Sequence, residues 1–295
     1  MRISKWLKKN TRELYGKKIA LTGATGGIGK ELCRYLLMLG AELILVDRSE
    51  KRQSELIDSL CALYPTANIK GIQCDLEYTN QVFRAADILI ENKIDVFIHN
   101  AGAYSIPRHK CDTGFDNVFQ INFLSPYLLI RRILPLLNER AGRVVVVGSI
   151  AHNYSVIDLN DADFSRRTRA SLVYGNAKRH LMFSLYPLFT GGSASLSVTH
   201  PGITLTNITA HYPPLVFALI KHPMRVIFMS PKRAALSILY GVFQQTEKNE
   251  WIGPRYFNIW GLPKLSKLKT VDEREAHEIQ KRAELFYRNI SSSTT

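Results

Sequence analysis

Six short apolar runs alternate along this chain with segments of helical periodicity. The runs are rich in Val, Ile and Leu and are apolar at most positions, as in strands covered on both faces. They are residues 18–23, 42–47, 68–75, 95–100, 143–149 and 195–200. Helical spacing is found over 28–39, 50–63, 79–92, 115–137, 171–189 and 231–245. This alternation predicts an α/β fold, a doubly wound parallel sheet of about seven strands with helices on both faces.

The length of 295 residues, 46% of them hydrophobic, predicts a single domain with appended ends. We expect a Rossmann-fold domain over 16–262, preceded by a basic extension, 1–15, and followed by a helical extension and tail, 263–295. Residues 203–230 break the rhythm with prolines among apolar side chains. They predict an insertion that covers a substrate, with packing within a lid or at a subunit interface as the alternative.

The formal net charge of +14 favours anionic partners. No zinc-finger spacing or RNP aromatic signature is present, so nucleic acid is not an expected partner. Ile3, Trp6 and Leu7 lie among basic residues, which allows either peripheral contact with an anionic membrane or a solvated leading helix. We expect a cytoplasmic protein, because no secretory apolar segment is visible and the four cysteines are scattered.

A glycine-rich stretch, "TGATGGIG", joins the first apolar run to the first helical segment. Gly23, Gly27 and Gly29 allow a tight turn and close approach of the backbone to a pyrophosphate. The following helix N-terminus supplies free N–H groups and a positive dipole. This arrangement of strand, glycine loop and helix predicts a dinucleotide site.

Asp47 and Arg48 at the end of the second run bear on which dinucleotide is bound. The carboxylate can accept hydrogen bonds from the adenosine ribose and would repel a 2′-phosphate, whereas the guanidinium could bind one. Thr25 in the glycine loop adds no positive charge. We therefore favour NAD, with NADP as the alternative.

Five motifs occur in the order typical of one family: "TGATGGIG", "HNAG" (99–102), Ser149, "YGNAK" (174–178) and "PGITLT" (201–206). Over residues 16–262 the chain resembles the short-chain dehydrogenase/reductase family. The long spacer between Ser149 and Tyr174 is more loosely similar to the retinol-dehydrogenase-like branch.

The resemblance implies catalytic roles for four residues. Tyr174 would be the general acid/base, and Lys178 would bind the nicotinamide ribose and lower the Tyr174 pKa. Ser149 would bind the substrate oxygen, and Asn122 would help hold a proton-relay water. Elementary chemistry agrees: Tyr174 and Lys178 are four residues apart on a helix, and a nearby cation favours a phenolate whose pKa is otherwise ~10.

The resemblance also implies cofactor contacts and an oligomer. Asp75 would contact adenine, Asn100 to Gly102 would support the central strand, and Ile203 and Thr206 would bind the carboxamide. The full expected set is Gly23, Thr25, Gly27, Ile28, Gly29, Asp47, Arg48, Asp75, Asn100, Ala101, Gly102, Tyr174, Lys178, Pro201, Ile203 and Thr206. Relatives form homodimers or homotetramers through helices that correspond to 115–137 and 171–189. His99 replaces the family's usual Asn, and we expect it to be structural.

The residues together predict an NAD(H)-dependent oxidoreductase that interconverts a hydrophobic secondary alcohol and ketone, of steroid, retinoid or other lipid type. The alternatives are an NADPH-dependent carbonyl reductase and a non-catalytic dinucleotide-binding redox sensor. The complete set of four catalytic residues argues against the sensor.

Overall fold

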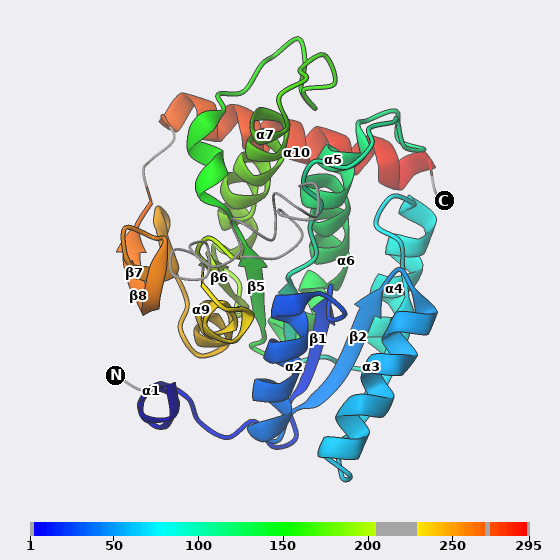
Figure 1. The fold of residues 1–295 in the computed structure, drawn as a ribbon. Coiled ribbons are helices and arrows are strands. Elements are labelled where there is room, and N and C mark those ends of the chain that lie inside the picture. The colour runs from blue at the N-terminus through cyan, green and yellow to red at the C-terminus, as the bar shows by residue number, and fades with distance from the viewer. Residues whose placement is uncertain (1–2, 205–228, 269–271, 294–295) are drawn as a thin grey trace, which may run out of the picture.

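All six apolar runs are strands of one sheet in the computed structural model, which describes residues 3–204, 229–268 and 272–293 (Figure 1). These strands are β1 (Lys18–Thr22), β2 (Glu42–Asp47), β3 (Ile69–Gln73), β4 (Val96–His99), β5 (Arg143–Val147) and β6 (Ser195–Thr199). Two more, β7 (Glu250–Tyr256) and β8 (Trp260–Lys267), complete the sheet. Its order is β3-β2-β1-β4-β5-β6-β7-β8, parallel as far as β7. The doubly wound α/β prediction is confirmed.

The described residues contain eight strands rather than about seven, because β8 returns antiparallel to β7. The predicted boundary after residue 262 therefore cuts a strand. Most positions of β8 are half-buried or exposed at the edge of the sheet. Its sequence, "WGLPKLSK", consequently has no continuous apolar run by which it could be recognised.

Side chains of successive strand residues point to opposite faces of the sheet and pack into two separate cores. Ile44 and Phe97 point into one core, with α4 (Thr79–Glu91), α6 (Ser125–Glu139) and α7 (Ala170–Ser184). Leu43 and Ile98 point into the other, with α2 (Gly27–Met38), α3 (Glu50–Leu63) and α9 (Pro231–Phe243). The sheet is thus covered on both faces, which explains why most positions of the inner strands β1, β2, β4 and β5 are apolar.

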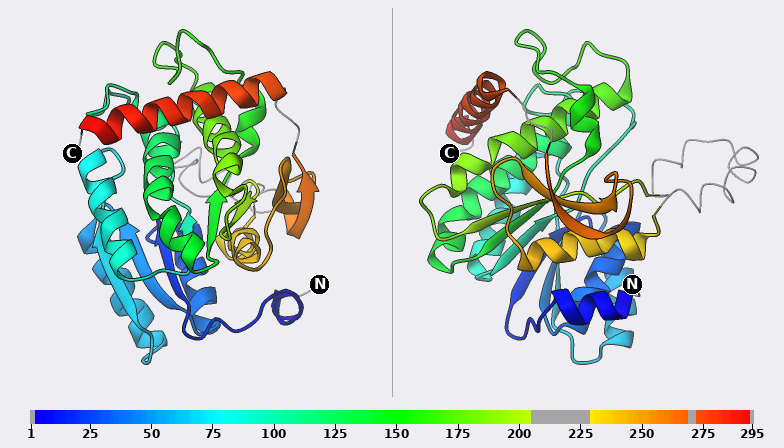
Figure 2. Two further views of the ribbon diagram at one scale, coloured as in Figure 1. Left: turned by 180° about the vertical axis from the view of Figure 1, so that it is seen from behind. Right: turned by 90° about the vertical axis from the view of Figure 1, so that its left-hand side faces the viewer.

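The basic N-terminal segment forms α1 (Ile3–Asn10), which lies beside α9 (Figure 2). Trp6 is 3% exposed and meets the Tyr240 ring edge to face, with 5.6 Å between ring centroids. Ile3 and Leu7 pack on the same core. The apolar side of α1 therefore stabilises the fold. None of the helices in the described residues is long and apolar enough to cross a membrane.

The C-terminal helix α10 (Glu273–Ser293) lies across α7 and α6 (Figure 2). Ala276, Ile279 and Ala283 are buried in the core that these helices share, so 272–293 belong to the domain and are not an appended tail. A homo-oligomer formed through α6 and α7 stays a prediction. In this structure α10 covers part of the surface of these two helices that such an interface would use.

A nearly buried ion pair fastens α10 to the rest of the domain. Arg179 of α7 donates from Nε and Nη2 to Glu275, at 2.7 and 2.5 Å, and both side chains are about one-tenth exposed. The same carboxylate accepts from the Ile157 N–H at 3.1 Å. Glu275 therefore joins three segments of the chain.

Removing this carboxylate charge should destabilise the protein. Glu275→Gln leaves the Arg179 guanidinium poorly paired in a buried place, so we expect the free energy of unfolding to fall by about 3 kcal/mol in urea titration. The control is Glu273→Gln, because Glu273 is 80% exposed in its pair with Lys248, and its effect should stay below about 0.5 kcal/mol. Equal effects would show that Glu275 does not fasten α10.

Candidate active site

The loops that follow β1, β4 and β5 meet at the carboxyl edge of the sheet. Thr22 of β1 pairs in register with His99 of β4, and the Asn100 and Ala101 N–H groups donate to Thr22 Oγ1 at 3.2 and 3.1 Å. Asn100 Nδ2 also donates to the Gly23 carbonyl at 2.9 Å. These bonds hold the glycine loop against the "HNAG" segment, as expected for a ligand site at the carboxyl ends of parallel strands.

The glycine loop requires glycine at two positions. Gly23 has φ +70°, and a Cβ there would lie 2.8 Å from Ala101 Cα. A Cβ on Gly29 would lie 2.2 Å from the Gly23 carbonyl oxygen. Larger residues would therefore open the turn and move the start of α2 away from β1.

The N-terminus of α2 suits an anionic group. Its cap, Gly26, provides no side-chain hydrogen bond, and its first turn has no acidic residue. By contrast, the cap of α3 is closed by Ser49, and its first turn contains Glu50. The first N–H groups of α2 and the close-packed loop around Gly23 thus fit the pyrophosphate of a dinucleotide.

Asp47 lies where the sequence places it, at the end of β2, and its carboxylate binds the glycine loop. It accepts from the Ala24 N–H at 3.2 Å and from the Thr25 N–H and Oγ1 at 3.3 and 2.9 Å. Burial raises the pKa of this carboxyl, and the hydrogen bonds from Thr25 and Ala24 oppose that shift. The carboxylate therefore positions the loop, while the adjacent Arg48 is exposed.

A hollow of about 400 Å³ lies beside Thr25, between the start of α2 and α3. Lys30 and Arg52 line it together with Glu55 and Ser59. It offers two cations near the loop in addition to Arg48, a feature that the sequence did not reveal, because these residues come from different helices.

Asn122 lies in a π-helical turn (Gln120–Leu124) between the short α5 (Asn117–Phe119) and α6. Its Nδ2 donates to the Ala103 and Val118 carbonyls, each at 2.8 Å, and its Oδ1 accepts from the Ala103 N–H at 3.2 Å. The side chain is fully buried. Asn122 therefore fixes the backbone just after "HNAG", and such π turns are frequent at functional sites.

Tyr174 and Lys178 lie one turn apart on α7, as predicted. Lys178 Nζ donates to the Val147 carbonyl at 2.9 Å and lies 5.7 Å from the centre of the Tyr174 ring. Ser149, which comes two residues after the end of β5, acts on the Tyr174 hydroxyl and lowers its pKa. A Cβ on Gly102 would lie 2.9 Å from Asn122 Oδ1 and 3.7 Å from Lys178 Nζ. The structure thus brings all four predicted catalytic residues to one place.

The pKa of Tyr174 moves opposite to the expected direction. Burial raises it to about 12, Tyr104 adds to the rise, and the Ser149 hydrogen bond lowers it. Burial also lowers the pKa of Lys178 to about 7, so the cation expected to favour the phenolate is itself destabilised. Lowering of the Tyr174 pKa by Lys178 together with the charge of an oxidised nicotinamide stays a prediction.

His99 is structural, as expected. Its ring is fully buried, and its Nδ1 lies 3.0 Å from Thr22 Oγ1, so it joins β4 to β1. Burial and the nearby Lys178 hold its pKa well below the ordinary value. The imidazole is therefore neutral near pH 7.

Tyr104 is a site residue that the sequence analysis missed. Its ring meets the Tyr174 ring edge to face, with 5.3 Å between centroids and an interplanar angle of 87°. It follows "HNAGA" directly, so an aromatic residue next to that motif was the available signal.

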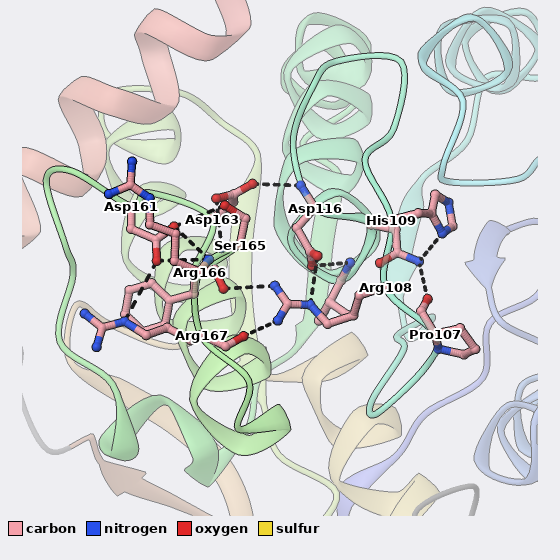
Figure 3. A network of polar contacts seen from close by, with 12 residues as sticks. Pro107, Arg108, His109, Asp116, Asp161, Asp163, Ser165, Arg166 and Arg167 are labelled. Atoms are coloured by element: carbon pink, nitrogen blue, oxygen red, sulfur yellow. Dashed lines mark hydrogen bonds and ion pairs between the residues drawn. The ribbon is translucent and has the colours of Figure 1, made fainter.

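Arg108 ties the loop after Tyr104 to the segment before α7 (Figure 3). It donates to Asp116 at 2.8 Å, to the Phe164 carbonyl at 2.9 Å and to the Arg167 carbonyl. Asp163 in turn accepts from the Asp116 N–H at 2.8 Å. The long spacer before Tyr174 is therefore held against the loop that contains Tyr104.

The remaining predicted cofactor residues lie around this edge. Asp75 follows β3 and accepts from the Glu77 N–H at 3.1 Å. Pro201 and Ile203 follow β6, where the Ile203 N–H donates to the Ile259 carbonyl at 3.2 Å. Residues 205–228 of the predicted insertion, Thr206 among them, lie outside the described residues. Thr204 and Met229, which flank this range, form a parallel bridge.

Comparisons with known proteins agree with this geometry. The short chain dehydrogenase family profile matches residues 17–160. Human retinol dehydrogenase 14 is 29% identical over 265 residues, which are 83% of this chain and 78% of that protein. The chain belongs to the short-chain dehydrogenase/reductase family, and it is an oxidoreductase that acts on CH–OH groups.

Solved structures extend the agreement in fold. An uncharacterized protein from Mycobacterium paratuberculosis has a TM-score of 0.76 at 23% identity, with 95% of this chain and 96% of that chain covered. RhlG from Pseudomonas aeruginosa, in a complex with NADP, has a TM-score of 0.60 at 24% identity, with 79% and 91% covered.

The burial of Lys178 predicts a pH-dependent cost in stability. Below pH 7 this lysine is protonated in both the folded and unfolded states, so the folded protein bears the full cost of burying the charge. Lys178→Met should therefore raise the Tm by roughly 5–10 °C at pH 6 in the absence of cofactor. As the pH rises from 7 toward 10.5, the folded lysine is neutral and this advantage should shrink.

The matched control is Lys70→Met, since Lys70 is exposed and bonded only to Asn92 among the contacts described. Its Tm difference should be small and independent of pH. A Lys178→Met variant less stable than the parent at pH 6 would contradict the prediction.

Proposed function

We propose that the protein is an NAD(H)-dependent oxidoreductase that interconverts a hydrophobic secondary alcohol and its ketone. The observation that carries this proposal is the convergence of Ser149 and Lys178 on Tyr174, with Asn122 fixing the adjoining backbone. This arrangement presents two hydroxyl groups to one substrate oxygen.

The chain's own groups then have distinct roles. In reduction, Tyr174 Oη gives its proton to the substrate oxygen, and in oxidation it takes one. Ser149 Oγ hydrogen-bonds the same oxygen where negative charge develops. Lys178 would hold the nicotinamide ribose, and the glycine loop with the α2 N-terminus would hold the pyrophosphate. Hydride transfer is the chemistry that a dinucleotide held there would supply.

The surroundings of Tyr174 favour an apolar substrate. Its ring packs, as do Ile106 and Leu172, against a small buried core, and the Tyr104 ring meets it edge to face. The sequence of 203–230 is also rich in apolar residues. Human retinol dehydrogenase 14 is named for an apolar alcohol. We therefore propose a steroid, retinoid or other lipid-derived substrate.

The charges around the glycine loop bear on which cofactor is bound. Asp47 at the end of β2 supports NAD, because its negative charge opposes a 2′-phosphate. The NADPH-dependent alternative is favoured by Lys30 and Arg52 in the hollow, by the exposed Arg48, and by the NADP complex of RhlG.

Tyr174→Phe tests the proton transfer. We expect kcat to fall at least about 100-fold, because the general acid/base is lost, while the cofactor Kd changes less than about threefold. Turnover is followed by nicotinamide absorbance over a panel of steroids, retinoids and aliphatic alcohols. Tyr104→Phe, which retains the ring contact, is the control. A Tyr174→Phe enzyme with normal turnover would refute the assignment, and cofactor binding without turnover of any substrate by the parent would favour the redox sensor.

A pair of variants tests the cofactor. Asp47→Ala should weaken NAD by at least about tenfold more than NADP, because it removes both a ribose acceptor and the charge that repels phosphate. Arg48→Ala is the matched variant and should affect NADP more than NAD. Fluorescence titration gives the four Kd changes. Equal losses for both cofactors in Asp47→Ala would mean that the carboxylate acts only by holding the loop.

A further inference from the structure

Three side chains of types that can bind a metal lie on the loops after β3 and β4, outside the predicted catalytic and cofactor residues. One ligand atom each from Glu77, His109 and Cys111 lies within 4.8 Å of the other two. His109 Nε2 is 2.9 Å from Glu77 Oε2. Within the described ranges, no other group of three or more His, Cys, Asp or Glu side chains meets this distance.

The two loops form a fixed frame for these side chains. Asp112, next to Cys111, accepts from the Thr79 N–H and Oγ1 at 3.0 and 2.7 Å, which joins the loop to the start of α4. The Cys111 N–H donates to the Phe115 carbonyl at 2.9 Å, and a bridge pairs Lys110 with Asp116. The backbone around the three side chains is thus held from both sides.

The donor set selects the ion. A thiolate, an imidazole and a carboxylate together suit zinc, which binds S, N and O donors in tetrahedral sites, whereas magnesium and calcium prefer oxygen alone. Bond lengths of about 2.0–2.3 Å put tetrahedral ligand atoms roughly 3.2–3.8 Å apart. In the structure His109 Nε2 and Glu77 Oε2 are 2.9 Å apart and the three ligand atoms lie within 4.8 Å of one another, so the observed separations bracket that spacing. We propose that Glu77, His109 and Cys111 bind a zinc ion, with a water molecule as the fourth ligand.

Binding requires protons to move. The Cys111 thiol proton goes to solvent, and His109 changes tautomer: Nε2 loses its proton to solvent and binds the metal, while Nδ1 takes a proton from solvent, so that the ring stays neutral. Nδ1 lies 3.1 Å from the Asn117 side-chain amide, whose Oδ1 is buried without a partner. A half-turn of that amide presents the oxygen to Nδ1–H as a second-sphere acceptor, in exchange for the bond to the Pro107 carbonyl.

The site connects the two loops that flank the predicted adenine contact. Glu77 is two residues from Asp75 and shares a turn with it through the Glu77 N–H. His109 follows Arg108, whose contacts in Figure 3 reach the segment before α7. A bound zinc ion would therefore fix the position of the Asp75 turn relative to the loop that contains Tyr104.

The test is a titration of the full-length, untagged protein with Co²⁺ as the spectroscopic probe. We expect one equivalent to give a thiolate-to-cobalt charge-transfer band with tetrahedral d–d bands, and Zn²⁺ to displace both. Cys111→Ser should abolish the charge-transfer band, and His109→Ala should weaken Co²⁺ at least about tenfold. The control is Cys61→Ser, since Cys61 is also partly exposed but belongs to α3.

A second readout is independent of cobalt. Zn²⁺ should raise the Tm of the parent and of Cys61→Ser, but not of Cys111→Ser, because an ion that binds only the folded state stabilises it. The proposal is overturned if the parent gives no thiolate band, or if Cys111→Ser retains the band and affinity. Neither result affects the proposed dehydrogenase activity.

Discussion

The parallel pairing of β1, β4 and β5 is the constraint on which the site depends. Because parallel strands end at the same edge, the glycine loop, "HNAG" and Ser149 emerge side by side although they are separated by up to 126 residues in the chain, from Gly23 to Ser149. The bonds of Asn100 and Ala101 to Thr22 lock that edge. Helix α7 then adds Tyr174 and Lys178 from one side.

Burial at this edge of the sheet disfavours the charged forms of Lys178 and Tyr174. Lys178 has one described acceptor, the Val147 carbonyl, and burial lowers its pKa to about 7. Tyr174 is shifted in the other direction. Both groups therefore favour their neutral forms, and the positive charge of an oxidised nicotinamide would act in the opposite direction on the phenol.

Much of the fold could be predicted, because parallel strands and amphipathic helices leave strong periodic patterns. The strands β1 to β6 and the helices between them lie within a few residues of their expected bounds. β8 was missed, since an edge strand with half-exposed positions has no such pattern. The role of α10 was missed for a related reason: its burial depends on contacts with α6 and α7, which are distant in sequence.

By itself, the sequence determined the fold class and the glycine loop, because each follows from local spacing, and its motif order predicted the four catalytic side chains. The tertiary structure decided which side chains and loops contact these residues. It directed the Asp47 carboxylate to the Thr25 loop, placed Tyr104 on Tyr174, and brought Glu77 to His109 and Cys111. Distances between loops and the burial of charges arise only when distant segments pack, so no local pattern in the chain could record them.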